Sequence, residues 1–375
     1  NSSKEIDKYR KEILFTEKKI NFFKKNENLR IVHVTNFNER HDGRLYFNTG
    51  RRINNGLIRL GHSILEFSDR DIQKYYKNFK DLSGSKRLNS KLLNTCNNFR
   101  PDMIILGHAD SIYPQTLKDL KKNYPSLKIA QWFLDPLNRK GPDFNKNKQR
   151  IMNKIEFVDE SFLTTSPKAL SFIRNKEKFH FIPNPADSSF ETLSNFTKSC
   201  NMDVFYALSH GVHRGVLKRG KFDERINFVS HLMRITPNVK FDVYGANNVQ
   251  PVWADNYLKA IANSKMGLNL SRGEPIKYYS SDRITQIIGN GLVTLIDEKT
   301  CYRDFFDDDE MVFYKNLNDL SEKIVRVARD EKLRKKIGKN GKNKYLKYFN
   351  STNVAEFIIK KSLNLKSKNR FIWEK

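Results

Sequence analysis

The chain has 375 residues, of which 38% are hydrophobic, and its 69 lysines and arginines against 42 aspartates and glutamates give a formal net charge of +27. No run reaches the roughly 18 apolar residues of a transmembrane helix, and three widely spaced cysteines exclude a disulfide framework or a cysteine zinc site. We therefore expect a cytoplasmic protein large enough for two cores, whose charge favours phosphate-bearing partners.

The first segment, residues 1–28, predicts a basic amphipathic helix. Such a helix either packs on the protein or lies on an anionic membrane surface, and packing is the favoured interpretation. Its apolar residues are Ile6, Ile13, Leu14, Ile20, Phe22 and Phe23.

Strands then alternate with helices as far as residue 187. Within this part, residues 158–173 are expected to form a strand followed by a helix. The alternation restarts at residue 202 and ends in long helices over 317–347. Alternating strands and helices predict parallel sheets, so the fold class is α/β, with two Rossmann-like, doubly wound domains facing a cleft.

The two series of elements set the expected domain boundaries. They are a basic helix over 1–28, a first domain over 29–185 that is completed by a C-terminal helix within 350–375, and a second domain over 186–349.

Residues 278–297 read as a polar loop, a short helix and a buried strand. Ser281 and Arg283 stand at the predicted helix start, where unpaired N–H groups and the helix dipole suit an anion. Gly289 and Gly291 bracket its end, where a left-handed residue is needed. The pattern predicts a helix that points its N-terminus at a bound phosphate.

Two nucleotide-binding fingerprints are missing. No G-x-G-x-x-G follows the first strand, and no G-x-x-x-x-G-K-[ST] loop occurs. Their absence argues against a dehydrogenase or a nucleoside triphosphatase.

The order of elements after residue 202 resembles the donor domain of GT-B glycosyltransferases. A strand is followed by a basic loop, a helix, the strand "FDVYG", a helix, another strand, and a helix that ends in glycine. The chain is similar to the group that contains the spore-maturation-type and family-4-like enzymes. The resemblance implies a nucleotide-sugar donor, a glycan or glycolipid acceptor, a role in polysaccharide or lipopolysaccharide biosynthesis, and no cofactor or metal.

The resemblance also assigns donor-binding residues. The family places an acidic residue five positions before the glycine that closes the donor-site helix, and here Gln286 stands five before Gly291. An amide can still hydrogen-bond a ribose hydroxyl. The family's earlier acidic residue has no clean match; Glu274, twelve before Gln286, is the candidate for sugar hydroxyls. Tyr244 and Gly245, at the end of "FDVYG", are candidates for contact with the base or ribose.

A basic loop after the first strand of the second domain supplies further phosphate ligands. Such loops lie at the carboxyl edge of the sheet, where ligands bind, and cations there can stabilise a departing diphosphate. The candidates are Arg214, Lys218 and Arg219, together with Arg283 and Ser281.

In the first domain, three residues follow strand ends and are candidates for catalysis. His108 is preferred as the base or orienting group for the acceptor hydroxyl, ahead of Asp42 and Asp135. The run Asp307–Asp309 is interpreted as a solvated acidic loop, so no metal ligands are predicted.

Two other functions remain open. One is a sugar-nucleotide epimerase or hydrolase on the same fold. The other is a basic nucleic-acid-binding protein, but its basic residues are dispersed and form no known module, so no nucleic-acid partner is expected. An anionic membrane surface on the cytoplasmic face is the further candidate partner, through the charge of the first domain and of residues 1–28.

Overall fold

The computed structural model describes residues 28–209, 212–213, 216–217, 223–365 and 371–374. The predicted helix over 1–28 therefore lies almost wholly outside the described residues.

A six-stranded, all-parallel sheet forms the first domain, in the order β2-β1-β3-β4-β5-β6. Each strand except the edge strand β2 is almost continuously buried, as parallel strands covered on both faces are. The strands are β1 (Arg30–Thr35), β2 (Ser63–Ser68), β3 (Met103–Gly107), β4 (Lys128–Phe133), β5 (Glu160–Leu163) and β6 (Phe179–Phe181). The helices are α2 (Thr49–Arg59), α3 (Asp69–Tyr75), α4 (Ser85–Phe99), α5 (Pro114–Asn123) and α6 (Phe144–Met152).

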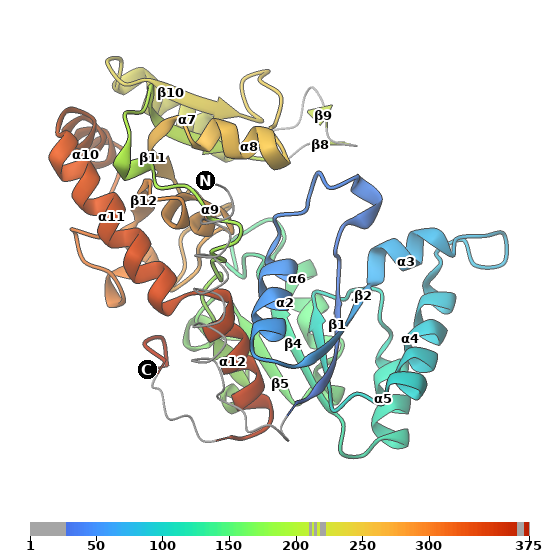
Figure 1. Ribbon diagram of the computed structural model, residues 1–375. Helices are drawn as coiled ribbons and strands as arrows, with labels where there is room; N and C mark the ends of the chain where they lie inside the picture. The colour runs from blue at the N-terminus through green and yellow to red at the C-terminus, as the bar shows by residue number, and fades with distance from the viewer. Residues whose placement is uncertain (1–27, 210–211, 214–215, 218–222, 366–370, 375) are drawn as a thin grey trace, which may run out of the picture.

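A second parallel sheet has five strands in the order β10-β7-β11-β12-β13. Its strands are β7 (Met202–Ala207), β10 (Phe241–Tyr244), β11 (Ser264–Leu268), β12 (Val293–Asp297) and β13 (Val312–Tyr314), and a small antiparallel pair joins β8 (Val212–His213) to β9 (Val216–Leu217). Its helices are α7 (Glu224–Ile235), α8 (Ala254–Ile261), α9 (Arg283–Gly289), α10 (Leu317–Arg329) and α11 (Glu331–Tyr348). Two parallel sheets flanked by helices confirm the predicted fold class (Figure 1).

The chain returns to the first domain at its end. Helix α11 runs from the second domain toward the first, and α12 (Ser351–Ser362) packs against α2 (Figure 1). A side chain at Gly56 would place its Cβ 2.2 Å from the Ser351 carbonyl oxygen, so only glycine allows this close approach. One hydrophobic core includes residues of both helices, among them Ile53, Leu57 and Val354, and thereby joins the end of the chain to the first sheet.

One expected helix does not form. After β5, which ends at Leu163, residues 164–173 contain only a single 3-10 turn, Pro167–Ala169, in place of the expected helix. Pro167 at the start of the turn and the irregular backbone that follows end the regular structure before a full helical turn is complete.

Candidate functional site

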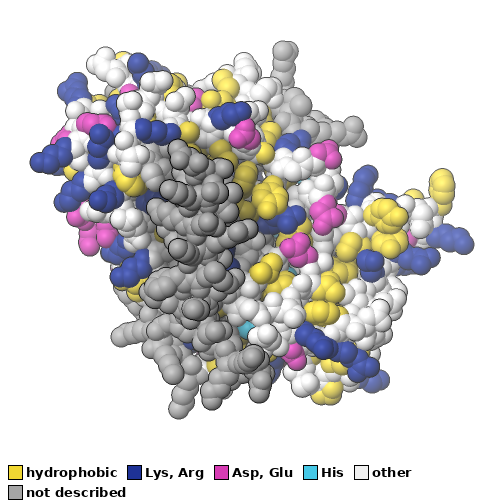
Figure 2. Space-filling model, in the orientation of Figure 1, with side chains coloured by type: hydrophobic (Ala, Val, Ile, Leu, Met, Phe, Trp, Pro, Cys, Tyr) yellow, Lys and Arg dark blue, Asp and Glu magenta, His cyan; other side chains and the backbone are white. Residues whose placement is uncertain are grey.

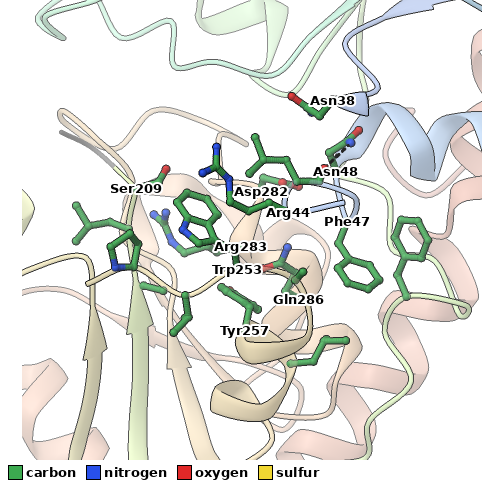
Figure 3. A pocket seen from close by; sticks show the side chains of 18 of the residues that line it. Asn38, Arg44, Phe47, Asn48, Ser209, Trp253, Tyr257, Asp282, Arg283 and Gln286 are labelled. Atoms are coloured by element: carbon green, nitrogen blue, oxygen red, sulfur yellow. Dashed lines mark hydrogen bonds between the residues drawn. The ribbon is translucent and has the colours of Figure 1, made fainter. Parts of the chain in front are cut away.

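A cavity of about 340 Å³ lies between the two domains and is lined by both. The first domain contributes the loop after β1 and the start of α2, and the second contributes the end of β7, the segment before α8, and α9 (Figure 3). The lining is Asn38, Arg44, Leu45, Phe47, Asn48, Arg52, Phe190, Glu191, Ala207, Leu208, Ser209, Pro251, Val252, Trp253, Ala254, Tyr257, Leu258, Asp282, Arg283 and Gln286. We call it the first cavity.

Aromatic rings and cations share the lining of the first cavity. The guanidinium of Arg44 lies 5.4 Å from the centre of the Trp253 ring, and Phe47 lies across from Tyr257 in Figure 3. The Tyr257 hydroxyl is buried and has no hydrogen-bond partner among the described residues. A planar, anionic ligand with hydrogen-bonding groups matches this combination.

Arg283 lines the first cavity, but it is half-buried and not the exposed side chain that the sequence suggested. Its guanidinium donates to the carbonyl oxygen of Leu270 and lies 5.3 Å from the centre of the Tyr206 ring, while its Nε has no partner in the described structure. These contacts hold the guanidinium against Tyr206 of β7 and the segment after β11, where Arg283 lines the first cavity.

Gln286 lies one helical turn after Arg283 on α9, and its amide faces the same cavity (Figure 3). Asp282 precedes them and contacts the first domain, because its carboxylate accepts a hydrogen bond of 2.9 Å from the Thr49 hydroxyl. The start of α9 is therefore in contact with α2.

A buried ion pair stands behind this contact. Arg52 on α2 is fully buried, and its guanidinium reaches the Glu191 carboxylate at 2.5 Å and the Asp282 carboxylate at 3.8 Å. Burial alone would lower the pKa of Arg52, but the carboxylates of Glu191 and Asp282 raise it, so the arginine stays charged. Arg52 thereby links α2 of the first domain to Glu191, in the segment that joins the two domains, and to Asp282, at the start of α9.

A second cavity, of about 320 Å³, opens beside the first and also joins the domains. It is lined by Asp135, Pro136, Asp143, Lys146, Asn147, Arg150, Arg225, Arg272, Tyr279 and Ser281. The side chains of Asp135 and Arg150 come from the carboxyl edge of the first sheet and from α6, and those of Arg225 and Ser281 come from the second domain. The cavity therefore brings two carboxylates of the first domain, Asp135 and Asp143, together with arginines of both domains, and Arg272 pairs with Asp143 across the domain boundary.

His108 and Asp135 are brought together, as neighbouring strand ends require. His108 Nδ1 lies 3.7 Å from the Asp135 carboxylate, and Arg150 reaches both, at 2.7 Å from His108 Nδ1 and 2.6 Å from Asp135. A guanidinium only donates, so Nδ1 accepts from Arg150, while the backbone N–H of Leu134 lies 3.4 Å from Nε2 on the other side of the ring. This arrangement gives His108 an orienting position and leaves Asp135 as the carboxylate that lines the second cavity.

Three buried histidines give folding a pH dependence. Burial lowers the pKa of His33, His62 and His108 to about 4 in each case, whereas these groups titrate near 6.5 when unfolded. Between about pH 6.5 and pH 4 these histidines take up protons in the unfolded chain but stay neutral in the folded one. The free energy of unfolding that they contribute is therefore fully present above about pH 6.5 and is lost as the pH falls toward 4. Burial also raises the pKa of Asp69, to about 6, and those of Glu191, Asp242 and Asp297, and these four carboxyl groups act in the opposite direction.

We therefore expect the free energy of unfolding to fall between about pH 6.5 and pH 4. Urea unfolding at a series of pH values measures this slope. His62→Gln should make it shallower, whereas the same change at the exposed His231 should not. Equal slopes in the two variants would contradict the assignment.

The remaining predicted donor residues separate into distinct places. Ser281 lines the second cavity, and its hydroxyl donates to the Asn269 side chain at 2.7 Å. Glu274 lines a third cavity of about 310 Å³ and lies near Lys140 of the first domain, with 3.3 Å between the ammonium and a carboxylate oxygen. Asn138 donates to the Glu274 carbonyl at 2.6 Å, so this loop forms part of the domain interface.

Other predicted residues lie outside these cavities. Tyr244 and Gly245 line none of the three; Gly245 has φ of 74°, and a side chain there would strike the Leu208 carbonyl, so it serves the turn. Asp42 is exposed, with φ of 52°, at the end of a 3-10 turn. Arg214, Lys218 and Arg219 fall outside the described residues.

Several lining residues were not singled out from the sequence. Arg44, Trp253, Tyr257 and Arg225 line the cavities, although none belongs to a spaced motif. The signal that was available is Trp253, a large aromatic side chain at the first residue of the segment 253–264 that was expected to form a helix.

The acidic run Asp307–Asp309 forms ion pairs with neighbouring cations. Asp308 pairs with Arg303 at 2.8 Å, and Asp309 pairs with Lys336 at 3.2 Å. Among the described residues, no group of three or more His, Cys, Asp or Glu side chains is arranged to hold a metal ion. In the same residues, every helix is too short or too polar to cross a membrane.

Comparisons with known proteins agree with this geometry. Residues 225–360 match a family model described as glycosyl transferase-like. No curated protein sequence matches the chain significantly.

Solved structures share the fold over most of the chain. Sucrose-phosphate synthase from Thermosynechococcus elongatus has a TM-score of 0.61 at 9% identity, over 89% of this chain and 98% of that one. An alpha-glucosyltransferase solved with UDP and a 13-mer DNA containing an HMU base has a TM-score of 0.62 at 13% identity. The match covers 90% of this chain and 100% of that one. HepE from Anabaena, solved with UDP and glucose, has a TM-score of 0.56 at 11% identity, and the match covers 90% of this chain and 100% of that one. The fold is that of the two-domain GT-B enzymes.

Proposed function

We propose that the chain, which has the GT-B fold and matches a glycosyl transferase-like model over residues 225–360, is a glycosyltransferase that transfers a sugar from a nucleotide-sugar to a hydroxyl group of a glycan or lipid-linked acceptor. The observation that carries this proposal is the pair of adjoining cavities between the domains, one with aromatic rings and arginines, the other with carboxylates and arginines.

The first cavity suits the nucleotide. Its aromatic rings, above all Trp253, offer surface for a base, and the unpartnered Tyr257 hydroxyl and the Gln286 amide offer hydrogen bonds to base or ribose. Arg283 stands between this cavity and Ser281 of the second, which is where the diphosphate would lie.

The second cavity suits the sugar and the acceptor hydroxyl. Asp135 is the carboxylate available to accept a proton or orient the hydroxyl. Arg225 and Arg272 of the second domain line the same cavity, where Arg225 pairs with Asp223 and Arg272 pairs with Asp143. Their remaining N–H groups are the proposed partners of a departing diphosphate, a role that arginine performs without a metal ion. We propose transfer without a resident metal or cofactor.

Nucleotide binding tests the donor site. We expect a nucleoside diphosphate to raise the melting temperature, and UDP is tested first because two similar structures were solved with it. Trp253→Ala should weaken binding by about tenfold or more, the scale of one base–aromatic stack. Tyr113→Ala, at a half-exposed tyrosine outside the three cavities, is the control. No shift with UDP, GDP, CMP or ADP would reject a donor site here.

A DNA acceptor is the second candidate. The net charge of +27 favours a polyanion, and one similar structure is a glucosyltransferase bound to DNA. An epimerase remains a further alternative, because a putative UDP-N-acetylglucosamine 2-epimerase from Listeria monocytogenes shares the fold with a TM-score of 0.52. Incubation with labelled UDP-sugars separates the three: label in glycan or lipid, label in DNA, or an epimerised free donor.

We further propose that the enzyme works at the cytoplasmic face of a membrane, in the synthesis of a surface polysaccharide or lipopolysaccharide. The excess of cations supports attraction to anionic lipids, which falls off with salt.

A further inference from the structure

The turn between α3 and α4 carries the most exposed apolar side chains among the described residues. Tyr75 is 81% exposed, Phe79 is 100% exposed and Leu82 is 76% exposed, whereas the next, Ile58 on α2, is 52% exposed. This turn projects from the first domain, and Figure 2 shows hydrophobic side chains beside lysines and arginines on that projection, at the right of the view. We call residues 74–91 the apolar tip.

The tip has a defined fold. Asn78 and Asp81 exchange two backbone hydrogen bonds of 3.2 and 3.1 Å, and the Asn78 side chain accepts from the Lys80 N–H at 2.9 Å. Gly84 has φ of 74°, and a Cβ there would lie 2.0 Å from the Gln73 carbonyl oxygen. The fold therefore holds Phe79 at the end of a tight turn, where it contacts no core.

The charge of the tip is strongly positive. Its only acid, Asp81, is buried and accepts from the N–H groups of Gly84 and Arg87 and from the Ser83 hydroxyl, so its carboxylate is used in the turn and is a single negative charge among the cations of the tip. The six cations are exposed: Lys74, Lys77, Lys80, Lys86, Arg87 and Lys91. Lys80, Lys86 and Arg87 also border a hollow of about 550 Å³ together with Phe79, which places cations around an apolar side chain.

We propose that the apolar tip docks the first domain on an anionic bilayer. Phe79 and Leu82 enter the boundary between head groups and acyl chains, and the surrounding cations bind the lipid phosphates. Exposed apolar side chains within a ring of lysines are the pattern of interfacial attachment, in which apolar burial and attraction to anionic lipids add together. A soluble protein partner would require a complementary acidic surface and is an outcome of the test below.

The tip lies on the side of the domain that faces the cavities. Helix α3 begins directly after β2, at the carboxyl edge of the sheet. From α3, Arg70 pairs with Asp110 at 2.9 Å, Asp110 pairs with Arg150 at 2.6 Å, and Arg150 pairs with Asp135 in the second cavity. If the proposed transfer is correct, docking would present the acceptor side to the membrane, so this consequence rests on the proposed function and favours a lipid-linked acceptor.

Vesicle sedimentation of the full chain tests the docking. We expect binding to vesicles of phosphatidylcholine with phosphatidylglycerol, little binding to phosphatidylcholine alone, and release in high salt. The double variant Phe79→Ser, Leu82→Ser should weaken binding by about tenfold or more, on the scale of burying one or two large apolar side chains. Ile58→Ser is the apolar control. Unchanged binding by the double variant would overturn the proposal.

The cations need their own matched pair of variants. Lys80→Glu with Lys86→Glu should abolish binding to the anionic vesicles. Lys118→Glu with Lys122→Glu, on the exposed side of α5, changes the net charge by the same amount but should retain most of the vesicle binding. Equal loss in both pairs would show attraction by overall charge alone and overturn the assignment to the tip.

A probe at the tip separates insertion from other contacts. Phe79→Trp should shift its fluorescence to the blue with anionic vesicles and be quenched by brominated acyl chains. An absence of quenching, or self-association on a sizing column that the Phe79→Ser, Leu82→Ser variant abolishes, would overturn membrane docking. Nucleotide binding without vesicles should be normal in the tip variants, so failure of the docking is distinguishable from failure of the donor site.

Discussion

Replacing Arg283 with alanine should lower the rate of sugar transfer by about 100- to 1000-fold, which corresponds to roughly 2.7–4 kcal/mol of transition-state stabilisation. The expectation follows from the place of the Arg283 guanidinium in the lining of the first cavity, at the start of α9, where we propose that the diphosphate lies. The contact strengthens as the leaving group gains negative charge, so kcat should fall more than donor affinity. Donor consumption and nucleotide titration, measured together, give the two effects.

The structure adds a control that this experiment needs. Arg283 also packs on Tyr206 and donates to the Leu270 carbonyl, so its loss should lower the melting temperature somewhat, and rates must be compared where both proteins are folded. Arg303→Ala is the matched variant, because Arg303 lies 4.3 Å from the centre of the Phe313 ring but lines none of the cavities. Wild-type turnover in folded Arg283→Ala would remove the site assignment.

Breaking the buried pair of Arg52 and Glu191 should cost about 3–5 kcal/mol of stability, because either single change leaves an uncompensated charge in the interior. Both side chains are almost fully buried, and the Glu191 carboxylate also accepts from the Asp187 N–H at 2.6 Å. Urea unfolding of Arg52→Met and Glu191→Gln measures the cost.

Two comparisons make this prediction specific. The double change Arg52→Met, Glu191→Met should recover much of the loss, since it removes both charges together. The exposed pair of Lys259 and Asp255 should contribute less than about 1 kcal/mol when broken. A Glu191→Gln variant as stable as the wild type would mean that Arg52 is compensated by Asp282 alone.

The periodicity of strands and helices was sufficient to predict two parallel sheets, since that pattern depends on which side chains each segment must bury. It failed at residues 166–173, where an apolar run after Pro167 resembles a helix locally but packs as an irregular segment. Parallel strands also end at one edge of their sheet, and His108 and Asp135, which were predicted separately as residues after strands, lie 3.7 Å apart at that edge.

The sequence by itself therefore determined the fold class, the excess of positive charge, the position of Asp135 after a strand and that of Arg283 at a helix start. Only the tertiary structure decided which of them share a cavity. Arg44 and Trp253 are 209 residues apart in numbering, and their contact depends on how the two domains meet. The burial of Arg52 and the exposure of Phe79 were likewise settled by packing, because burial depends on what the rest of the chain places over a side chain and local sequence does not encode that.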